Sequence, residues 1–410
     1  MCSSDLPGTA SATNNSFLNK TKHGDIDGFI ASFDGSTGSL IKSTYAGTDN
    51  VDVIYGIKFD KKGYPYIMGT TRGANNWPTV SANPIGNSTS SAKQFVAKLQ
   101  EDLNRVIFST VFGPGGFRPN MSPVAFLVDR CENMYVSGWG GWIDSRPDPF
   151  EQGNVTGMPI TPDAIQKNTD ARDFYFIVIK KNASDLLYGT YYGQNGGEGE
   201  HVDGGTSRFD QEGIIYQGIC ANCGGNSSPF PVFTGPNGRV WSKINGAAST
   251  GGCNLAALKI AFNFAGVSGG LQSEIEGKIR NYGCTPLVVD FFDSTYKRSK
   301  TSWEWTVYGG PTTGNPVLHQ QITKDSSYQY TFPDSISTGN YLVRLIVTDS
   351  NSCNVTDTSY MTIRARDTRA TLSIGPPVKV GSCDSSNTYV YSNNSVAPAG
   401  YIFSGTSFTW

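Results

Sequence analysis

Residues 27–33, with the sequence DGFIASF, begin a unit that recurs along the first two thirds of the chain. The unit continues with residues 40–45 (LIKSTY) and 55–60 (YGIKFD), and it ends with residues 64–69 (YPYIMG). Apolar and polar residues alternate within these stretches, which favours short β-strands. The last two stretches are joined by residues 60–63 (DKKG), where glycine supplies the positive φ that a tight hairpin needs.

The same order of four strands returns twice and begins a fourth time at residues 254–260. A proline-containing connector such as residues 77–80 (WPTV) lies between the copies, and Asn133 replaces the turn glycine in the second copy. Four antiparallel strands per repeat are typical of a β-propeller blade. The chain is therefore predicted to be all-β, with a partial β-propeller of about three to four blades over residues 25–265. The side chains expected to face between its sheets are Phe29, Phe33, Phe95, Leu99, Phe176 and Ile260.

The strand order, the turn motif and the proline connector of residues 25–265 resemble the SBBP repeats of secreted Bacteroidota surface proteins. The resemblance implies a group of proteins associated with gliding motility and type IX secretion. It also implies further blades outside the sequence, because propellers typically have four to eight. Proteins of this group often end in a sorting domain, so the secretion route is implied by the resemblance alone.

A second domain is expected over residues 278–366, where apolar residues recur with a period of two. About 85 residues of short alternating strands with turn signals favour an immunoglobulin-like β-sandwich. Residues 339–349 (GNYLVRLIVTD) resemble the penultimate strand of PKD domains, and residues 303–305 (WEW) stand where that family carries its tryptophan-aspartate signature. The paired acidic residues of that signature are absent, so no metal role is expected for this loop.

Three other segments complete the expected organisation. Residues 1–24 form an N-terminal segment, and MCSSDL at residues 1–6 matches the translation of a common sequencing-adapter end, which raises the expectation of an artefact there. Residues 266–277 are small and polar and are expected to form a linker. Residues 367–410 are expected to be the start of a further β domain that is truncated within a strand-like run.

The composition excludes some classes of partner. Charged residues make up 16% of the chain, against about 25% in typical domains. The formal net charge is −2 and no basic cluster is present, so no nucleic-acid partner is expected. No apolar run approaches the roughly 20 residues that span a bilayer, so no membrane span is expected.

Seven cysteines besides Cys2 are scattered through strand-type sequence, which favours an oxidising compartment with a few disulfides. Cys284 and Cys353 bracket the sandwich and are expected to pair with each other. Seven is an odd number, which is explained if Cys383 pairs with a cysteine beyond the end of the sequence. No pairing can be derived for Cys131.

Cys220 and Cys223 form a Cys-x-x-Cys motif, which could be redox-active or half of a zinc site. No second pair and no neighbouring histidine in the sequence completes a zinc set. A structural disulfide to which Cys253 contributes is therefore preferred.

No catalytic constellation is visible in the sequence. His23, His201 and His319 fall in separate segments, with no metal-ligand spacing around them. Asp25 and Asp27 could join a calcium loop, but neither an EF-hand nor a glycine-aspartate repeat array accompanies them. We therefore expect no enzyme activity, no cofactor and no metal.

Residues 266–270 (GVSGG) match the Gly-x-Ser-x-Gly pattern of a nucleophile elbow around Ser268. An elbow needs a strand before the serine and a helix after it. The sequence from Leu271 onward does not favour a helix, so a structural segment is preferred over a nucleophile.

Trp139 and Trp142 flank two glycines on a loop that follows a predicted strand. Such aromatics could stack on sugar rings or hold a protein partner. Packing against a neighbouring blade is preferred, because large aromatic side chains usually become buried.

Three functions remain open at this level. The preferred one is a non-catalytic extracellular scaffold, adhesion or ligand-binding fragment of a large bacterial surface protein. Its partners would be a surface glycan, a protein or other modules of the same full-length chain. A polysaccharide lyase or glycosidase is the second, and convergent carboxylates in one cleft would identify it. The third is an accessory carbohydrate-binding region of a secreted polysaccharide-degrading enzyme, which retention on immobilised polysaccharide would reveal.

Overall fold

A computed structural model of the chain confirms the all-β prediction. The described residues form strands and one short 3₁₀ turn at Lys181–Ala183, with no α-helix among them. No helix in the described part has the length and apolar character needed to cross a membrane. The chain divides into two compact units, Met1–Gly266 and Val267–Trp410. The structure describes residues 18–19, 21–22, 24–73, 77–142, 152–197, 199–202, 207–224, 230–232, 240, 252–295, 300–350, 352–367, 373–380 and 388–397, of which 141, 142 and 152 are described by their backbone only.

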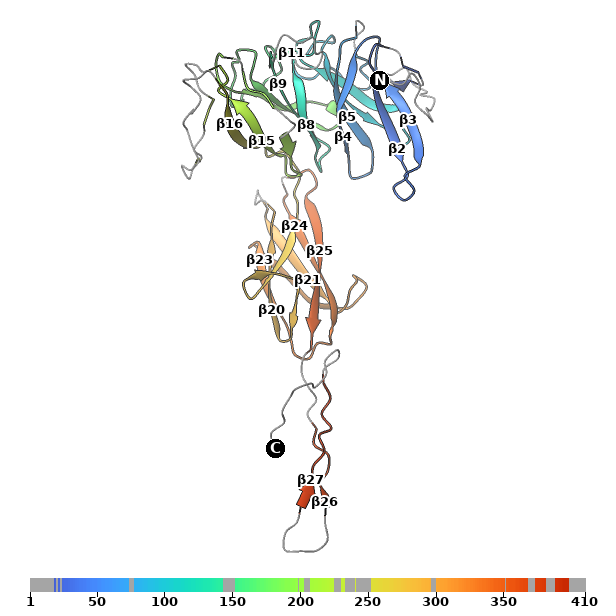
Figure 1. Cartoon of the computed structure of the whole chain (residues 1–410), viewed down its shortest axis with the longest axis vertical. Coiled ribbons are helices and arrows are strands. Elements are labelled where there is room, and N and C mark those ends of the chain that lie inside the picture. Colours follow the sequence, from blue (N-terminus) through green and yellow to red (C-terminus); the bar gives the residue numbers. More distant parts are fainter. Residues whose placement is uncertain are drawn as a thin grey trace. The chain divides into compact units, whose positions relative to one another are not determined.

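The first unit consists of small antiparallel sheets that follow one another along the chain (Figure 1). Two sheets have four strands, in the orders β4-β5-β6-β7 and β8-β9-β12-β13, and two have three strands, in the orders β1-β3-β2 and β14-β15-β16. A short pair, β10 and β11, completes the unit. The strands are β1 (Leu18–Asn19), β2 (Gly28–Phe33), β3 (Leu40–Ala46), β4 (Asp52–Phe59), β5 (Pro65–Thr71), β6 (Gln94–Leu99), β7 (Val106–Phe112), β8 (Ser122–Val128), β9 (Met134–Trp139), β10 (Gly141–Trp142), β11 (Gln152–Gly153), β12 (Phe174–Ile179), β13 (Leu186–Tyr192), β14 (Ser207–Phe209), β15 (Ile214–Ala221) and β16 (Asn254–Ala261).

The sheets are out of phase with the repeat in the sequence. Each four-stranded sheet combines the last two strands of one copy with the first two strands of the next, because β5 pairs with β6 and β9 pairs with β12. The four strands of one copy therefore do not form one sheet. The physical reason is that the connector between copies leads the chain back antiparallel beside the strand it has just left.

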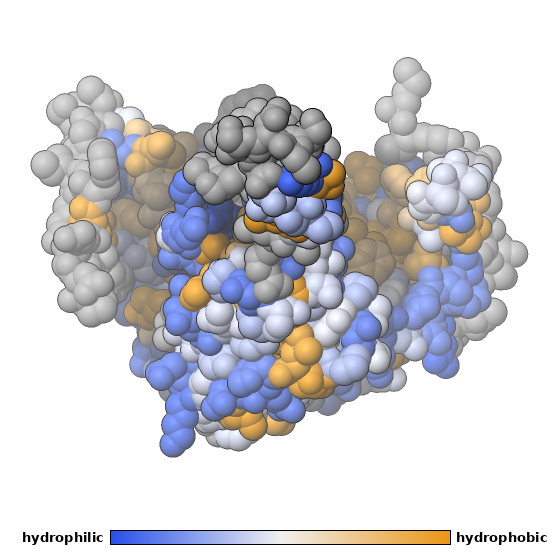
Figure 2. All heavy atoms as spheres, turned by 90° about the horizontal axis from the view of Figure 1, so that it is seen from below, coloured by the Kyte–Doolittle hydropathy of each residue, from blue (hydrophilic) through white to orange (hydrophobic). Residues whose placement is uncertain are grey.

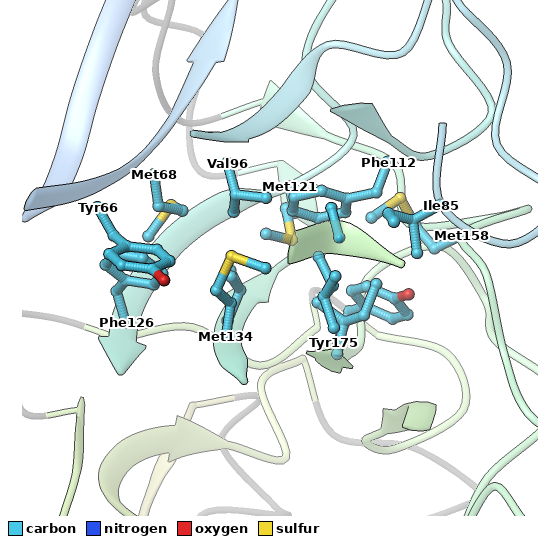
Figure 3. Close-up of a cluster of buried hydrophobic side chains, with 14 of the residues drawn as sticks. Tyr66, Met68, Ile85, Val96, Phe112, Met121, Phe126, Met134, Met158 and Tyr175 are labelled. Atoms are coloured by element: carbon cyan, nitrogen blue, oxygen red, sulfur yellow. The ribbon is translucent and has the colours of Figure 1, made fainter. Parts of the chain in front are cut away.

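Three hydrophobic cores lie between successive sheets of this unit. Figure 3 shows the middle core, where Val96 and Phe112 from the second sheet meet Phe126 and Tyr175 from the third. Both faces of the third sheet are covered, so every residue of β12 is buried. Strands that are buried on both faces form continuous apolar runs in place of an alternating pattern.

The side chains predicted to face between sheets divide into two groups. Phe95, Leu99 and Phe176 are fully buried, and Ile260 packs against the third core. Phe29 and Phe33 were placed wrongly, because each is 59% exposed. Both lie on the face of β2 opposite to Ile30, the residue that enters the first core, and no described sheet covers that outer face.

The second unit has two sheets whose inner faces share one core. The strand orders are β18-β17-β20-β23 and β19-β25-β24-β21-β22. Apolar residues alternate with polar ones along these strands, so that Trp303 and Trp305 both point into the core. The strands are β17 (Leu271–Ile275), β18 (Lys278–Ile279), β19 (Tyr282–Cys284), β20 (Leu287–Asp293), β21 (Ser302–Tyr308), β22 (Val317–Thr323), β23 (Ser327–Phe332), β24 (Gly339–Thr348) and β25 (Thr356–Arg366).

The linker predicted over residues 266–277 is wrong, because β17 occupies its second half and pairs with β20. Leu271, Ser273 and Ile275 are buried on one face of β17, and the residues between them are more exposed. Of the three inward-facing residues, only Leu271 and Ile275 are apolar. This alternation is too weak to be recognised in the sequence.

The predicted disulfide between Cys284 and Cys353 is also wrong, because Cys284 carries a reduced, exposed thiol. Cys353 is in a disulfide, as is Cys131, but Cys284 is not its partner. Cys284 lies beside Arg366 at the end of β25, whereas Cys353 precedes the first residue of that strand. An 11-residue strand is about 35 Å long, far beyond the roughly 7 Å between Cα atoms that a disulfide spans. The two cysteines bracket the domain in sequence and lie at opposite ends of it in space.

The segment 367–410 contains one described hairpin. β26 (Val378–Val380) and β27 (Thr388–Val390) pair antiparallel, and their apolar side chains are exposed.

Candidate functional site

A groove of about 1100 Å³ lies in the second unit, at the open edge between its two sheets. Ile275 and Leu287, both buried, belong to its lining, while Arg364, Arg366 and Tyr282 present exposed side chains to it. A hollow with an apolar floor, a few cationic groups and one exposed aromatic ring is a common form of ligand site.

Strand pairing brings the groove residues together. β19 is a three-residue strand that pairs parallel to the end of β25, with Tyr282 opposite Arg364 and Cys284 opposite Arg366. On the other side of β25, Asn340 of β24 lies opposite Arg364. Tyr282, Arg364 and Asn340 therefore form one row across three strands, because directly paired residues point to the same face of a sheet.

Three arginines and two carboxylates, Glu276 and Asp290, line the groove, so its positive charges outnumber its negative ones by one. Arg280 pairs with Glu276, and its guanidinium lies 5.8 Å from the centre of the Tyr282 ring. Arg364 and Arg366 form no ion pair with any described residue. Exposed guanidinium groups bind carboxylates and sulfates in a two-point geometry, and Tyr282, with 58% of its surface exposed, offers a face for stacking.

The first unit contains a second polar cluster, a buried carboxyl pair formed by Asp173 and Glu200. Asp173 immediately precedes β12, and Glu200 follows β13 in a glycine-rich loop. The two side chains are 0% and 1% exposed. A Cβ at Gly193 would stand 2.1 Å from Asp173 Oδ1 and 2.4 Å from Glu200 Oε2, so the two oxygens face one point that only glycine leaves free.

Burial and the neighbouring charge of Asp173 raise the pKa of Glu200 to about 8. Burial and the charge of Asp170 raise the pKa of Asp173 to about 6. Two close carboxyl groups with raised and unequal pKa values can hold a proton between them. These side chains are closed off from solvent, however, so the pair does not form the cleft with convergent carboxylates that a lyase or glycosidase needs.

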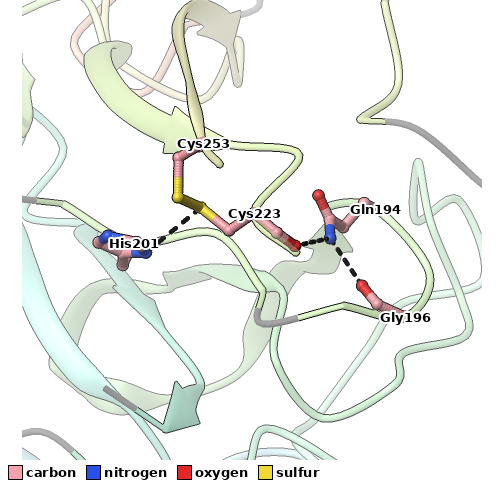
Figure 4. The surroundings of a disulfide bond; sticks show 5 residues. All are labelled: Gln194, Gly196, His201, Cys223 and Cys253. Atoms are coloured by element: carbon pink, nitrogen blue, oxygen red, sulfur yellow. Dashed lines mark hydrogen bonds between the residues drawn. A yellow bond between two sulfur atoms is a disulfide. The ribbon is translucent and has the colours of Figure 1, made fainter. Parts of the chain in front are cut away.

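The thiol–histidine cluster consists of His201, Cys220, Cys223 and Cys253. The structure joins Cys223 to Cys253, two of the predicted disulfide candidates, in a bond with a Cα separation of 4.1 Å (Figure 4). Cys220, the third candidate, carries a reduced thiol. His201 lies in the same place, with its Nδ1 atom 3.9 Å from Cys223 Sγ.

Trp139 is 5% exposed and packs in the third core, with its ring 6.0 Å from that of His201. This is the packing preferred from the sequence, and it leaves Trp139 unable to stack on a sugar. The side chain of Trp142 lies outside the described residues.

The other candidate residues do not converge. Ser268 is 1% exposed and precedes a strand, β17, where a nucleophile elbow requires a helix. His319 lies in β22, stacked on Tyr328 and hydrogen-bonded to its hydroxyl at 2.5 Å. His23 and Cys383 lie outside the described residues, and so do residues 1–6.

Sequence reasoning missed the groove and the position of His201. The alternation in residues 360–366 (YMTIRAR) does place Arg364 and Arg366 on one face of a strand. Nothing local indicates that Tyr282 would pair beside them. His201 forms a two-residue bridge with Cys220, and a pairing so short leaves no pattern in the sequence.

No known protein family matches this chain, and no curated protein is significantly similar to it.

Proposed function

We propose that the chain is a non-catalytic extracellular scaffold or adhesion segment of a large bacterial surface protein, and that its groove binds an acidic surface glycan. The groove carries the proposal, because Arg364, Arg366 and Tyr282 combine free cationic groups with an exposed ring. Sugar rings stack on such aromatics, while carboxylate or sulfate groups accept hydrogen bonds from arginine.

Several other features support this proposal. Consecutive small sheets with dense cores between them are compatible with propeller blades, and the two-sheet second unit is compatible with a PKD-like sandwich. The Cys223–Cys253 disulfide suits an oxidising location outside the cytosol. Figure 2 shows a face on which hydrophilic residues cover most of the described surface and hydrophobic residues form small separate groups.

Retention of the full chain on immobilised polysaccharides tests the proposal. We expect retention on carboxylated or sulfated polysaccharide, little on neutral polysaccharide, and release by salt. The double variant Arg364→Ala, Arg366→Ala should weaken binding at least tenfold, because charge-assisted hydrogen bonds contribute about 1.5–3 kcal/mol each. Lys324→Ala is the matched control, since it removes an exposed positive charge from the same unit outside the groove.

Two outcomes would contradict the proposal. Equal retention on neutral and acidic polysaccharides would show that the arginines do not contribute to binding. A double variant that binds as tightly as the parent chain would show the same. Shortening of the polysaccharide during incubation would show that the chain is catalytic.

A further inference from the structure

The structure brings together four side chains that are separated by up to 52 positions in sequence numbering, from His201 to Cys253. One nitrogen of His201 and the sulfur atoms of Cys220 and Cys253 all lie within 4.8 Å of one another. Cys223 Sγ is bonded to Cys253 Sγ and lies 3.9 Å from His201 Nδ1. Three sulfurs and one imidazole nitrogen therefore share one small volume. Figure 4 shows three of the four side chains, those of His201, Cys223 and Cys253.

The local structure explains why these donors meet. Cys220 is in β15, and Cys223 follows in a turn where Asn222 and Gly224 have φ values of 57° and 80°. These positive φ values reverse the direction of the chain after Cys220. The side chain of Cys223 therefore lies near those of His201 and Cys253. Cys253 directly precedes β16, whose first residue pairs with the last residue of β15. His201 is hydrogen-bonded through its backbone to Cys220 in both directions, at 3.3 and 3.0 Å.

We propose that His201, Cys220, Cys223 and Cys253 form a tetrahedral zinc site when the Cys223–Cys253 disulfide is reduced, and that the disulfide is the oxidised, metal-free form of the same site. Three cysteines and one histidine, two of them in a Cys-x-x-Cys turn, are a common ligand set of structural zinc. Zinc–ligand bonds of about 2.0–2.3 Å place tetrahedral donor atoms about 3.5–3.8 Å apart. The observed separations need only small side-chain shifts to reach that geometry.

Reduction of the disulfide and binding of zinc require no other group of the chain. A dithiol reductant gives two electrons and two protons to the Cys223–Cys253 disulfide and is itself oxidised to a disulfide. Zinc then binds three thiols and neutral His201, and three protons leave as the thiols become thiolates. The zinc form belongs where thiols are kept reduced, and the disulfide form belongs in an oxidising compartment.

The cluster is buried at Cys223, half-buried at His201 and Cys220, and exposed at Cys253. Cys223 is fully buried, and the ring of Trp139 lies 6.0 Å from that of His201. Gln194 Nε2 donates hydrogen bonds to the carbonyl oxygens of Cys223 and Gly196, at 3.1 and 2.6 Å. These contacts hold the backbone of the Cys-x-x-Cys turn, and supporting contacts of this kind orient metal ligands.

The experiment measures zinc bound by the full chain after reduction with a dithiol, by competition with a chromophoric chelator and by elemental analysis. We expect one zinc per chain in the reduced form and almost none in the oxidised form. Cobalt should replace zinc and give the visible absorption of a tetrahedral thiolate site. Cys220→Ser and His201→Ala should each weaken zinc binding at least about 100-fold.

Cys284→Ser is the matched control, because Cys284 is also a reduced thiol but lies in the other unit; its zinc binding should equal that of the parent chain. The oxidised Cys220→Ser variant should melt like the oxidised parent, which separates loss of a ligand from loss of the fold. Zinc binding that is absent in the reduced parent, or unchanged by Cys220→Ser, would overturn the proposal. If reduction unfolds the first unit, zinc must restore its near-ultraviolet circular dichroism; failure to do so would also overturn it.

Discussion

At the scale of single residues, buried charges are accommodated by specific partners. Asp293 is the clearest case, because its Oδ2 atom lies 2.8 Å from Lys300 Nζ and accepts a hydrogen bond of 2.9 Å from Trp303 Nε1. The amide of Gly270 donates to its other oxygen at 3.0 Å. This network ties the start of the second unit to the end of β20 and the beginning of β21.

We expect Asp293→Asn to destabilise the second unit by about 3–5 kcal/mol, because it leaves Lys300 charged and buried without its partner. The side chains of Lys300 and Asp293 are 2% and 0% exposed, so water cannot replace the lost interaction. Chemical denaturation measures the change. Asp334→Asn, at an exposed position, is the control and should shift stability by less than about 0.5 kcal/mol. Equal stabilities of the two variants would show that the buried pair contributes nothing.

Glu132 gives the first unit an acid-sensitive contact. Burial acts to raise its pKa, but hydrogen bonds from Lys181, Lys98 and Tyr66 outweigh burial and lower the pKa to about 2. Lys98 approaches Glu132 at 2.8 Å and also pairs with Asp60 at 2.7 Å, so the contact joins two adjacent sheets.

Because the folded-state pKa of Glu132 is below its ordinary value of 4.5, its contribution to stability is present above about pH 4.5 and is lost as the pH falls toward 2. We expect the melting temperature of the first unit to fall between pH 6 and pH 3, and to fall less in Glu132→Gln. Glu101→Gln, at an exposed position, should follow the parent profile. Identical profiles for Glu132→Gln and the parent would refute this assignment.

At the scale of elements, equivalent positions of the repeat have different environments. Phe29 in β2 and Phe95 in β6 occupy the second position of corresponding strands. Phe95 is fully buried and stacks on Trp77 with ring centres 3.6 Å apart, whereas Phe29 is 59% exposed. The difference arises because the sheet of β6 lies between two other sheets, whereas described residues cover only one face of β2.

This contrast predicts unequal effects of the same substitution. Phe95→Ala should destabilise the first unit by about 3–5 kcal/mol through a buried cavity, and Phe29→Ala should change its stability by less than about 0.5 kcal/mol. Denaturant midpoints of the two variants provide the measurement. A large loss in Phe29→Ala would mean that the outer face of β2 is covered in solution.

At the scale of the whole molecule, the chain has separate cores in its two units, divided at Gly266. Domains with their own cores usually unfold as separate cooperative units. Calorimetry of the full chain should therefore show two transitions. Asp293→Asn should lower only one of them, and Phe95→Ala should lower only the other. A single transition that both variants shift would indicate that the units unfold together.

The sequence by itself determined the all-β character, the short strands and the tight turns between them. These features follow from local rules: alternating side chains define a strand, and a turn such as residues 60–63 needs glycine at a positive φ, which Gly63 has, at 88°. The same reasoning assigned Phe176 and Leu99 to the interior correctly, but it placed Phe29 and Phe33 there wrongly.

Only the tertiary structure decided which strands pair, which cysteines meet and where a groove forms. The sheets run across the repeat boundary, Cys284 lies far from Cys353, and His201 joins three cysteines through a bridge with Cys220. Tyr282 reaches Arg364 only because a three-residue strand pairs with residues 82 positions away in the numbering. Pairings of this kind depend on the closure of long loops and on the packing of whole sheets, and short-range patterns carry no information about either.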